Sequence, residues 1–266
     1  MLSNVELERT GTEDIVCVKA VPLVAALKRR RSCRSFNAKV AMNMHELSEV
    51  LWSCDGISSS DPEADDLGHG AAPRHTHASG GAIYPLQVYV LVERVRGLQP
   101  GAYKYIAQTG QLEGPMEPPD SSQQNAGCQP TGIFKLAVAV GATLPHVVSS
   151  EEASAGRQVW ADKAAALLVL CVDQYKAEER GGFYAKANVD LCLVEVGMAA
   201  QSALLAVAAQ EHLGACPIGA FDVEAVKGSL PGVGVGKEPV LMLAMGRPTR
   251  PEELPLHSRP SPAASA

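Results

Sequence analysis

This chain of 266 residues has no excess of positive charge. Lys and Arg number 23 against 29 Asp and Glu, which gives a formal net charge of −6. That balance argues against general nucleic-acid binding and against a basic membrane-binding patch. Hydrophobic residues make up 46% and charged residues 20% of the chain. This composition is ordinary for a globular protein and excludes disorder for the bulk of the chain.

Paired cysteines, a targeting segment and long apolar runs are missing too. The seven cysteines include no CxxC pair and no zinc-like spacing, and several, such as Cys171 and Cys192, lie in apolar surroundings. They are predicted to be buried, reduced side chains. The N-terminus has no apolar h-region, and no uninterrupted apolar run approaches the ~18 residues of a membrane span. We expect a cytoplasmic protein with no membrane or nucleic-acid partner.

The common nucleotide, metal and nucleophile motifs are likewise missing. The glycines of 232–237 resemble a phosphate loop, but they precede a predicted strand and fit neither GxGxxG nor the P-loop spacing. His69, His75 and His77 lie in one polar segment, yet no carboxylate or cysteine pattern beside them completes a metal site. No GxSxG or HExxH sequence occurs. The prediction is therefore that the chain binds no metal ion.

Helical and strand patterns are mixed without regular alternation, which indicates an α+β fold. Short helices are expected at 22–30 and at 43–54, where Asn43 can act as the N-cap and Glu46 can complete a capping box. The polar stretch 58–77 is expected to be a surface loop. Strands are predicted at 86–92, at 134–140 and 164–172 (both apolar enough for burial on two faces), at 240–245, and in a hairpin at 102–112.

Residues 189–213 form the longest periodic segment and predict a helix that is apolar on nearly all sides. Such a helix must be buried on more than one face, either in the centre of a domain or at a dimer interface. Gly214 follows directly and is expected to end the helix as its C′ residue.

The segment 30–36 reads Arg-Arg-Ser-Cys-Arg-Ser-Phe and follows the first predicted helix. Its first six residues hold three arginines and two hydroxyls, a compact arrangement that suits an anion. Guanidinium groups and hydroxyls match phosphate oxygens, and each charge-assisted bond contributes roughly 1.5–3 kcal/mol. Taken alone, a basic cluster is more often a solvated helix end. The acidic net charge makes any such site local, which favours a small phosphorylated ligand.

Three later segments carry small or basic residues: one just before a predicted strand, one shortly after the long predicted helix, and one at the end of the last predicted strand. Residues 79–85 read Ser-Gly-Gly-Ala-Ile-Tyr-Pro, and 217–222 read Pro-Ile-Gly-Ala-Phe-Asp. Successive small residues allow the backbone to approach a planar ligand closely. Residues 245–248, Met-Gly-Arg-Pro, place an arginine at the end of the last predicted strand. Each segment by itself equally fits a plain turn or a solvated arginine.

The order of these four segments around the long helix resembles the nitroreductase family of FMN-dependent oxidoreductases, most of all its branch of SagB-type azoline dehydrogenases. The resemblance covers about residues 23 to 248. It implies a nitroreductase-like α+β fold, with a central mixed β-sheet flanked by helices and a long helix at a homodimer interface. One FMN-binding domain would extend over 1–257, followed by a flexible tail at 258–266.

The cofactor-binding residues that this resemblance implies are Arg30, Arg31, Ser32, Arg34, Ser79, Gly80, Gly81, Pro217, Ile218, Gly219, Ala220 and Arg247. Arg30, Ser32 and Arg247 would hold the FMN phosphate. Arg34 would lie at the pyrimidine edge, where its charge stabilises the reduced flavin. The residues 79–81 would line the isoalloxazine ring, and 218–220 would lie near N5, the atom that accepts hydride.

The implied reaction is a ping-pong cycle in which NADH or NADPH reduces the flavin and a small electron-poor acceptor, such as a nitroaromatic or a quinone, reoxidises it. That cycle requires no side-chain acid or base, so no catalytic residue is assigned; Phe183, Tyr184 and Phe221 are candidates for stacking or for core packing. Azoline dehydrogenases share an adjacent Lys-Tyr pair where this chain has Lys176 and Ala177. A specialised azoline-type dehydrogenase, and a flavin-binding protein without turnover, remain as alternatives.

Overall fold

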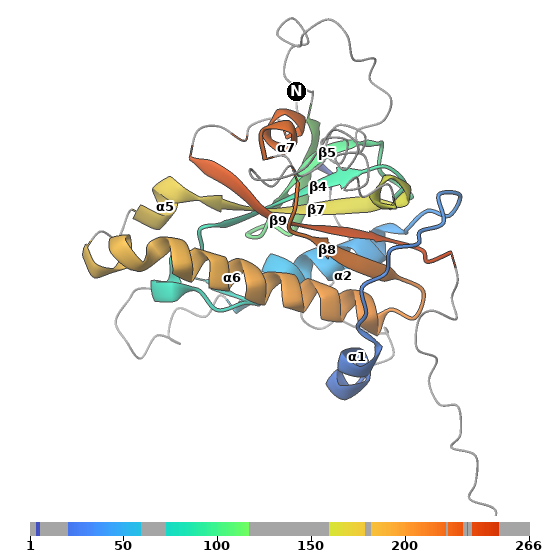
Figure 1. Cartoon of the computed structure of the whole chain (residues 1–266), viewed down its shortest axis with the longest axis horizontal. Helices are drawn as coiled ribbons and strands as arrows, with labels where there is room; N and C mark the ends of the chain where they lie inside the picture. The colour runs from blue at the N-terminus through green and yellow to red at the C-terminus, as the bar shows by residue number, and fades with distance from the viewer. Residues whose placement is uncertain are drawn as a thin grey trace, which may run out of the picture.

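The computed structural model describes residues 4–5, 21–59, 73–116, 160–178, 182–221, 223–230, 233 and 236–249, of which 4–5, 116, 182–189 and 225 are described by their backbone alone. A sheet of seven strands forms the centre. In spatial order its strands are β1 (Asn4–Val5), β6 (Gln111–Met116), β5 (Gly101–Ile106), β4 (Leu86–Val92), β7 (Ala166–Asp173), β9 (Lys237–Gly246) and β8 (Gly214–Ile218). Helices α1 (Leu23–Arg29), α2 (Met44–Asp55) and α6 (Gly182–Ala209) lie on one side, and α7 (Val223–Ser229) lies on the other (Figure 1).

The α+β class predicted from the sequence is confirmed, with one correction to the sheet. Neighbouring strands of this sheet run antiparallel at every described pairing, so the sheet is not mixed as expected. Parallel pairing is confined, among the described residues, to isolated bridges such as that between Ser32 and Ala215. Antiparallel neighbours need no crossover helix between them, which is why the sequence shows no regular βα alternation.

Strand β7 lies inside the sheet, between β4 and β9, and is buried along Ala166 to Val172. Its even-numbered residues pack with α2 and α6, whereas Leu167, Val169 and Cys171 pack with α7 on the opposite face. A strand covered on both faces needs apolar side chains at every position. The prediction that 164–172 is buried on both faces is therefore confirmed.

Helix α2 begins and ends where its local sequence directs. The Asn43 side chain accepts a hydrogen bond from the Glu46 backbone N–H at 2.8 Å, and the Glu46 carboxylate accepts one from the Asn43 N–H at 2.8 Å. This reciprocal pair confirms the predicted capping box. The helix ends at Asp55, and at Gly56 an added Cβ would lie 2.3 Å from the Trp52 ring. The tight turn at Gly56 therefore fixes the direction in which the chain leaves Asp55.

Helix α6 confirms the long apolar helix, but it begins earlier than predicted, at Gly182, and its C-terminus also differs from the prediction. The helix ends at Ala209, and Gly214 is the first residue of β8 rather than a helix C′ residue. A Cβ at Gly214 would lie 2.7 Å from Cys33, because the segment after α1 runs beside the strand there, with a parallel bridge between Ser32 and Ala215. Close approach of two chain segments, not a helix cap, explains this glycine.

One face of α6 stays uncovered in the single chain. Leu193 and Val194 are 48% and 58% exposed, and Leu191 and Met198 are exposed beside them. By length and composition alone, Asp190–Ala209 could cross a membrane. Its other face packs on α2, α1 and the sheet, as a core helix of a globular domain does, and such helices pass the same test.

The predicted loop at 58–77 is partly ordered by a second, two-stranded sheet. Strands β2 (Ile57–Ser59) and β3 (Arg74–His75) pair antiparallel, so each end of the segment is extended. Between them, 60–72 lies outside the described residues, as do the predicted strand at 134–140 and the tail at 258–266. The hairpin at 102–112 and the strands at 86–92 and 240–245 are confirmed by β5 and β6, β4 and β9.

Candidate functional site

The arginine-rich segment lies between β8 and the residues that follow β9. The Cys33 N–H donates to the Ala215 carbonyl at 2.8 Å. Further along, the Asn37 N–H donates to the Arg247 carbonyl at 2.8 Å, and the Thr249 N–H donates to a carbonyl of the same segment. Three parts of the chain that are far apart in sequence therefore meet at the β8 edge of the sheet.

The side chains of this basic segment point outward. Arg31, Ser32 and Arg34 are exposed, and Arg30 is half-buried. Burial raises the pKa of the Cys216 thiol, while the charge of Arg34 and a hydrogen bond with Ser32 oppose that rise. Both side chains therefore lie next to β8.

Arg247 is already engaged within the chain. Its guanidinium group forms an ion pair with the Glu46 carboxylate at 2.5 Å, and both side chains are largely buried. Glu46 is also the capping residue of α2, so this ion pair joins the end of β9 to the start of that helix. An anionic ligand that binds Arg247 would therefore contact a guanidinium group that also pairs with Glu46.

The exit from β8 combines a buried anchor with exposed small residues. The Ile218 side chain is buried in the core with Phe36, and Pro217 is half-buried. The next residues, Gly219 and Ala220, are exposed. The sheet therefore fixes the strand end, while the backbone beyond it remains accessible to a flat ligand.

The loop before β4 has an unusual backbone. Gly81 has φ +67°, and two residues with side chains, Ala82 and Tyr84, have φ of 53° and 49°. The left-handed region costs an L-residue roughly 1–2 kcal/mol, and such strain clusters at functional sites. The Ser79 hydroxyl stabilises the loop, because it accepts from the Tyr84 N–H at 2.9 Å and donates to Glu195 at 2.5 Å.

The basic segment and this loop contact α6 at positions far apart along the helix. Arg29 donates to the Ala209 carbonyl at 3.4 Å, at the C-terminal end of α6. A Cβ at Gly80, in contrast, would lie 3.3 Å from the Leu191 side chain. At ~1.5 Å per residue, positions 191 and 209 are about 27 Å apart along the helix axis. Within one chain, the structure does not bring Ser79, Gly80 and Gly81 next to the arginines.

A cavity of about 550 Å³ lies between α1, α2, α6 and the small β2–β3 sheet. Its walls include Trp52, His75 and Leu205. None of the predicted cofactor-binding residues lines it. The cavity is therefore a feature that the sequence patterns did not reveal.

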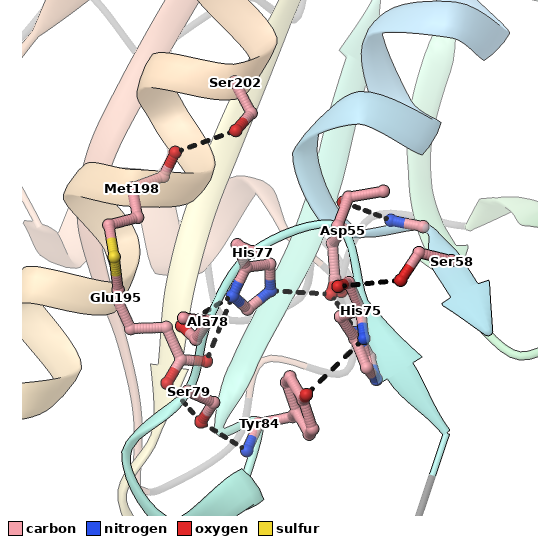
Figure 2. Close-up of polar contacts among 12 residues, drawn as sticks. Asp55, Ser58, His75, His77, Ala78, Ser79, Tyr84, Glu195, Met198 and Ser202 are labelled. Carbon is pink, nitrogen blue, oxygen red and sulfur yellow. Dashed lines mark hydrogen bonds and ion pairs between the residues drawn. The ribbon is translucent and has the colours of Figure 1, made fainter. Parts of the chain in front are cut away.

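A buried polar cluster next to this cavity was also missed (Figure 2). His75 Nδ1 lies 2.5 Å and His77 Nε2 lies 3.0 Å from the same oxygen, Oδ1 of Asp55. On its other side, His77 Nδ1 lies 3.2 Å from the Ala78 carbonyl and 3.8 Å from the Glu195 carboxylate. Asp55 comes from the end of α2, both histidines come from the stretch that includes β3, and Glu195 comes from α6.

Burial sets the electrostatics of this cluster. Burial alone would raise the pKa of Asp55, but its hydrogen bonds with His75 and His77 outweigh that effect and the pKa lies below its usual value. For His77, burial would lower the pKa, yet the bond with Asp55 holds the pKa above its usual value. For Glu195, burial raises the pKa and dominates over the Ser79 hydrogen bond.

Two signals in the sequence could have indicated this cluster. Glu195 is the one charged residue in the otherwise apolar stretch 191–200, and a buried acid is rare unless it has a partner. His75 and His77 are two residues apart, a spacing that places both side chains on the same face of an extended segment. Asp55 carries no such signal, because a polar residue at a helix end is ordinary.

Comparison with known proteins decides the family. The model of the nitroreductase family matches residues 27–247. The chain belongs to the nitroreductase family. This confirms the resemblance inferred from the four segments, and it supports a flavin-dependent oxidoreductase in general terms.

Individual relatives agree with that membership. A provisionally named nitroreductase of Methanocaldococcus jannaschii is 33% identical over 91 residues, which span 34% of this chain and 40% of that protein. A provisionally named nitroreductase of Ralstonia eutropha superposes with a TM-score of 0.57 and 21% identity, over 88% of this chain and 86% of its own. A chain of the Escherichia coli microcin synthetase complex McbBCD, with truncated pro-MccB17 bound, superposes with a TM-score of 0.57 and 19% identity. The superposition covers 90% of this chain and 86% of that chain. At such identities the two structures show a shared nitroreductase fold.

Proposed function

We propose that this nitroreductase-family chain is an FMN-dependent NAD(P)H oxidoreductase that reduces electron-poor acceptors such as nitroaromatics and quinones. The observation that carries the proposal is the charge at the β8 edge. Within the described part of the chain, Arg30, Arg31 and Arg34 form no ion pair with a carboxylate. Three guanidinium groups beside the Ser32 hydroxyl fit a phosphate dianion in charge and in donor chemistry.

Different residues at this edge would bind the phosphate and the ring system of FMN. Arg30, Ser32 and Arg247 would hold the phosphate, and Arg34 would lie at the edge of the ring system, where its positive charge favours an anionic reduced form. The exposed backbone at Gly219 and Ala220 allows a planar ring to approach without a side chain in between. FMN, when bound, supplies the hydride chemistry, with NADH or NADPH as its electron donor.

We further propose that the active protein is a homodimer whose cofactor site uses both chains. The loop at Ser79 and the start of the basic segment contact α6 at positions 191 and 209, which are about 27 Å apart along the helix axis, too far for one flavin to contact both within one chain. A second chain with its α6 antiparallel to the first would place the loop of one chain beside the arginines of the other. The exposed apolar face of α6, with Leu193 and Val194, would then be buried between the two chains.

An azoline-type dehydrogenase is the second candidate, because the fold is shared with a chain of the McbBCD complex. The structure offers one observation against it. Ala177, at the position where those enzymes have the tyrosine of a Lys-Tyr pair, is 4% exposed and packs in the core. Lys176 beside it is half-buried, and its backbone N–H donates to the Asp173 side chain. A tyrosine side chain at position 177 would have to displace core residues.

The visible spectrum of the purified protein, followed by anaerobic titration with NADH and then with NADPH, tests the proposal. We expect a yellow protein that bleaches with one nicotinamide and recovers its colour when a quinone or nitroarene is added. A yellow protein that neither nicotinamide reduces would favour the specialised dehydrogenase or a flavin binder without turnover. A colourless protein that does not take up added FMN would refute the proposal.

A further inference from the structure

We propose that Asp55, His75 and His77 form a binding site for a divalent transition-metal ion such as Zn²⁺. This site is separate from the basic edge at β8, and it does not depend on the flavin function proposed above. Within the described residues, one donor atom from each of the three side chains lies within 4.8 Å of the other two. The site reverses the prediction that the histidines of this segment bind no metal.

The donor set and its burial match known metal chemistry. Two imidazoles and one carboxylate are the protein ligands of many catalytic zinc sites and of the iron sites called facial triads. The side chains of Asp55 and His75 are each 7% exposed, and that of His77 is fully buried. Metal–ligand bonds of about 2.0–2.2 Å would replace the present hydrogen bonds between the Asp55 carboxylate and the two imidazoles.

The surroundings of the histidines resemble the outer shell of a metal site. A ligating histidine commonly directs its second ring nitrogen to a carbonyl or carboxylate, which fixes the ring and its tautomer. His77 does so, because Nδ1 faces the Ala78 carbonyl and Glu195 while Nε2 faces Asp55 (Figure 2). The His75 ring is fixed in a different way, since it stacks on Tyr84 with centroids 3.9 Å apart and planes 17° from parallel.

An unpartnered buried atom is a second, independent observation. Among the described residues, Glu195 Oε1 is buried and has no hydrogen-bond partner, and it points toward His77 at 3.8 Å. Two carboxylates, Asp55 and Glu195, thus face two imidazoles inside the protein. Buried charges are normally paired or bound to metals, because desolvating an uncompensated charge costs several kcal/mol. A divalent cation bound in place of the imidazole protons would balance the charge of Asp55.

The cavity gives the site an entry path. His75 and Thr76 form part of its wall, opposite Ser202 and Leu205 of α6. An ion with three protein ligands keeps at least one coordination position for water or a small ligand. Of the three proposed ligands, His75 lines the cavity, so that position would be reached from the cavity side.

Metal analysis of the full-length protein, purified without chelator, followed by Zn²⁺ titration of the chelator-treated protein, tests this proposal. We expect one Zn²⁺ per chain and calorimetric binding that Asp55→Asn weakens at least about 100-fold, since loss of an outer-shell partner alone costs about 10–100-fold. His77→Gln should have a similar effect. The matched control is His45→Gln, because this histidine lies on the exposed side of α2, away from the cluster. Equal Zn²⁺ affinity in all four proteins would overturn the proposal.

A measurement on the unmodified protein guards against variants that fail to fold. Co²⁺ added in place of Zn²⁺ should give d–d absorption bands beyond the flavin absorption, with the intensity of a four- or five-coordinate site containing nitrogen. A spectrum no stronger than that of hydrated Co²⁺ would show that the cluster is held by hydrogen bonds only, and the proposal would be wrong. FMN content, measured on the same samples, shows separately whether the flavin proposal stands.

Discussion

At the scale of single residues, the arginines at the β8 edge combine high charge density with few internal partners. Arg29 pairs with Glu211 and Arg247 pairs with Glu46, whereas the neighbouring Arg30 has no such partner among the described carboxylates. A cation that the fold does not neutralise is available to a ligand. We therefore expect Arg30 to contribute more to the proposed phosphate binding than the paired arginines Arg29 and Arg247.

Replacement of Arg30 by alanine should weaken FMN binding at least tenfold, because one charge-assisted phosphate contact contributes roughly 1.5–3 kcal/mol. Fluorescence titration of flavin-free protein with FMN measures the change. Lys28→Ala is the matched control, since Lys28 is an exposed cation of the same helix. Equal losses in both variants would point to a general effect of positive charge rather than to a phosphate contact.

The strained loop before β4 gives a second residue-scale prediction. Ala82→Gly should stabilise the protein by about 0.5–1 kcal/mol. Glycine removes the conformational cost of φ 53° in the folded state, but it also raises the entropy of the unfolded chain, which offsets part of the gain. The reference substitution is Ala25→Gly within α1, which should destabilise by about 1 kcal/mol. Urea denaturation of the parent protein and of the two variants measures the sign of each change in the free energy of unfolding. A destabilised Ala82→Gly protein would mean that the methyl group makes contacts that outweigh the backbone strain.

At the scale of elements, α2 joins several parts of the molecule. Glu46, in its first turn, also forms an ion pair with Arg247, which follows β9, and its last residue is Asp55 of the buried cluster. Its middle carries Glu49, which faces His45 one turn earlier. Burial raises the pKa of Glu49, and the charge of His45 only partly opposes that rise.

The raised pKa of Glu49 predicts how stability depends on pH. A carboxyl whose pKa is higher in the folded state stabilises that state below its unfolded pKa, and this contribution is lost as the pH rises through the folded value. Glu49→Gln should therefore be more resistant to urea than the parent at neutral pH, and the difference should vanish at about pH 4. Glu178→Gln serves as the comparison, because it removes the same charge from an exposed position in helix α5 (Gln174–Glu178). A gain that is equal at both pH values would contradict the assignment to ionisation.

At the scale of the whole molecule, local signals predicted the elements, and contacts between distant segments decided the rest. The capping box at Asn43 and the buried strand β7 depend on nearby residues, and both were predicted. Gly214 was misassigned as a helix cap because its role comes from Cys33, a residue far away in the sequence. The cluster of Asp55 with His77 and Glu195 was missed for the same reason, since spacing along the chain carries no information on which helices meet.

The apolar face of α6 predicts the oligomeric state. Val194→Lys should convert a dimer to a monomer, because it places a charge in the middle of the proposed interface, and flavin should be lost with the second chain. Light scattering coupled to gel filtration measures the mass, and the absorbance ratio at the flavin band measures retention. Val40→Lys alters an exposed apolar residue outside α1 and α6 and should leave both unchanged. A Val194→Lys protein that remains dimeric with full flavin would place the interface elsewhere.

The hydrogen bond from Ser79 to Glu195 joins the loop expected to face the isoalloxazine ring to the carboxylate beside His77. Binding equilibria that share a structural element are thermodynamically coupled, and the coupling is reciprocal. If a cation beside His77 changes the affinity of the protein for FMN by some factor, FMN must change the affinity for that cation by the same factor. The concentration of metal ions in the cell would then influence what fraction of this protein carries the proposed FMN, through a single hydroxyl group.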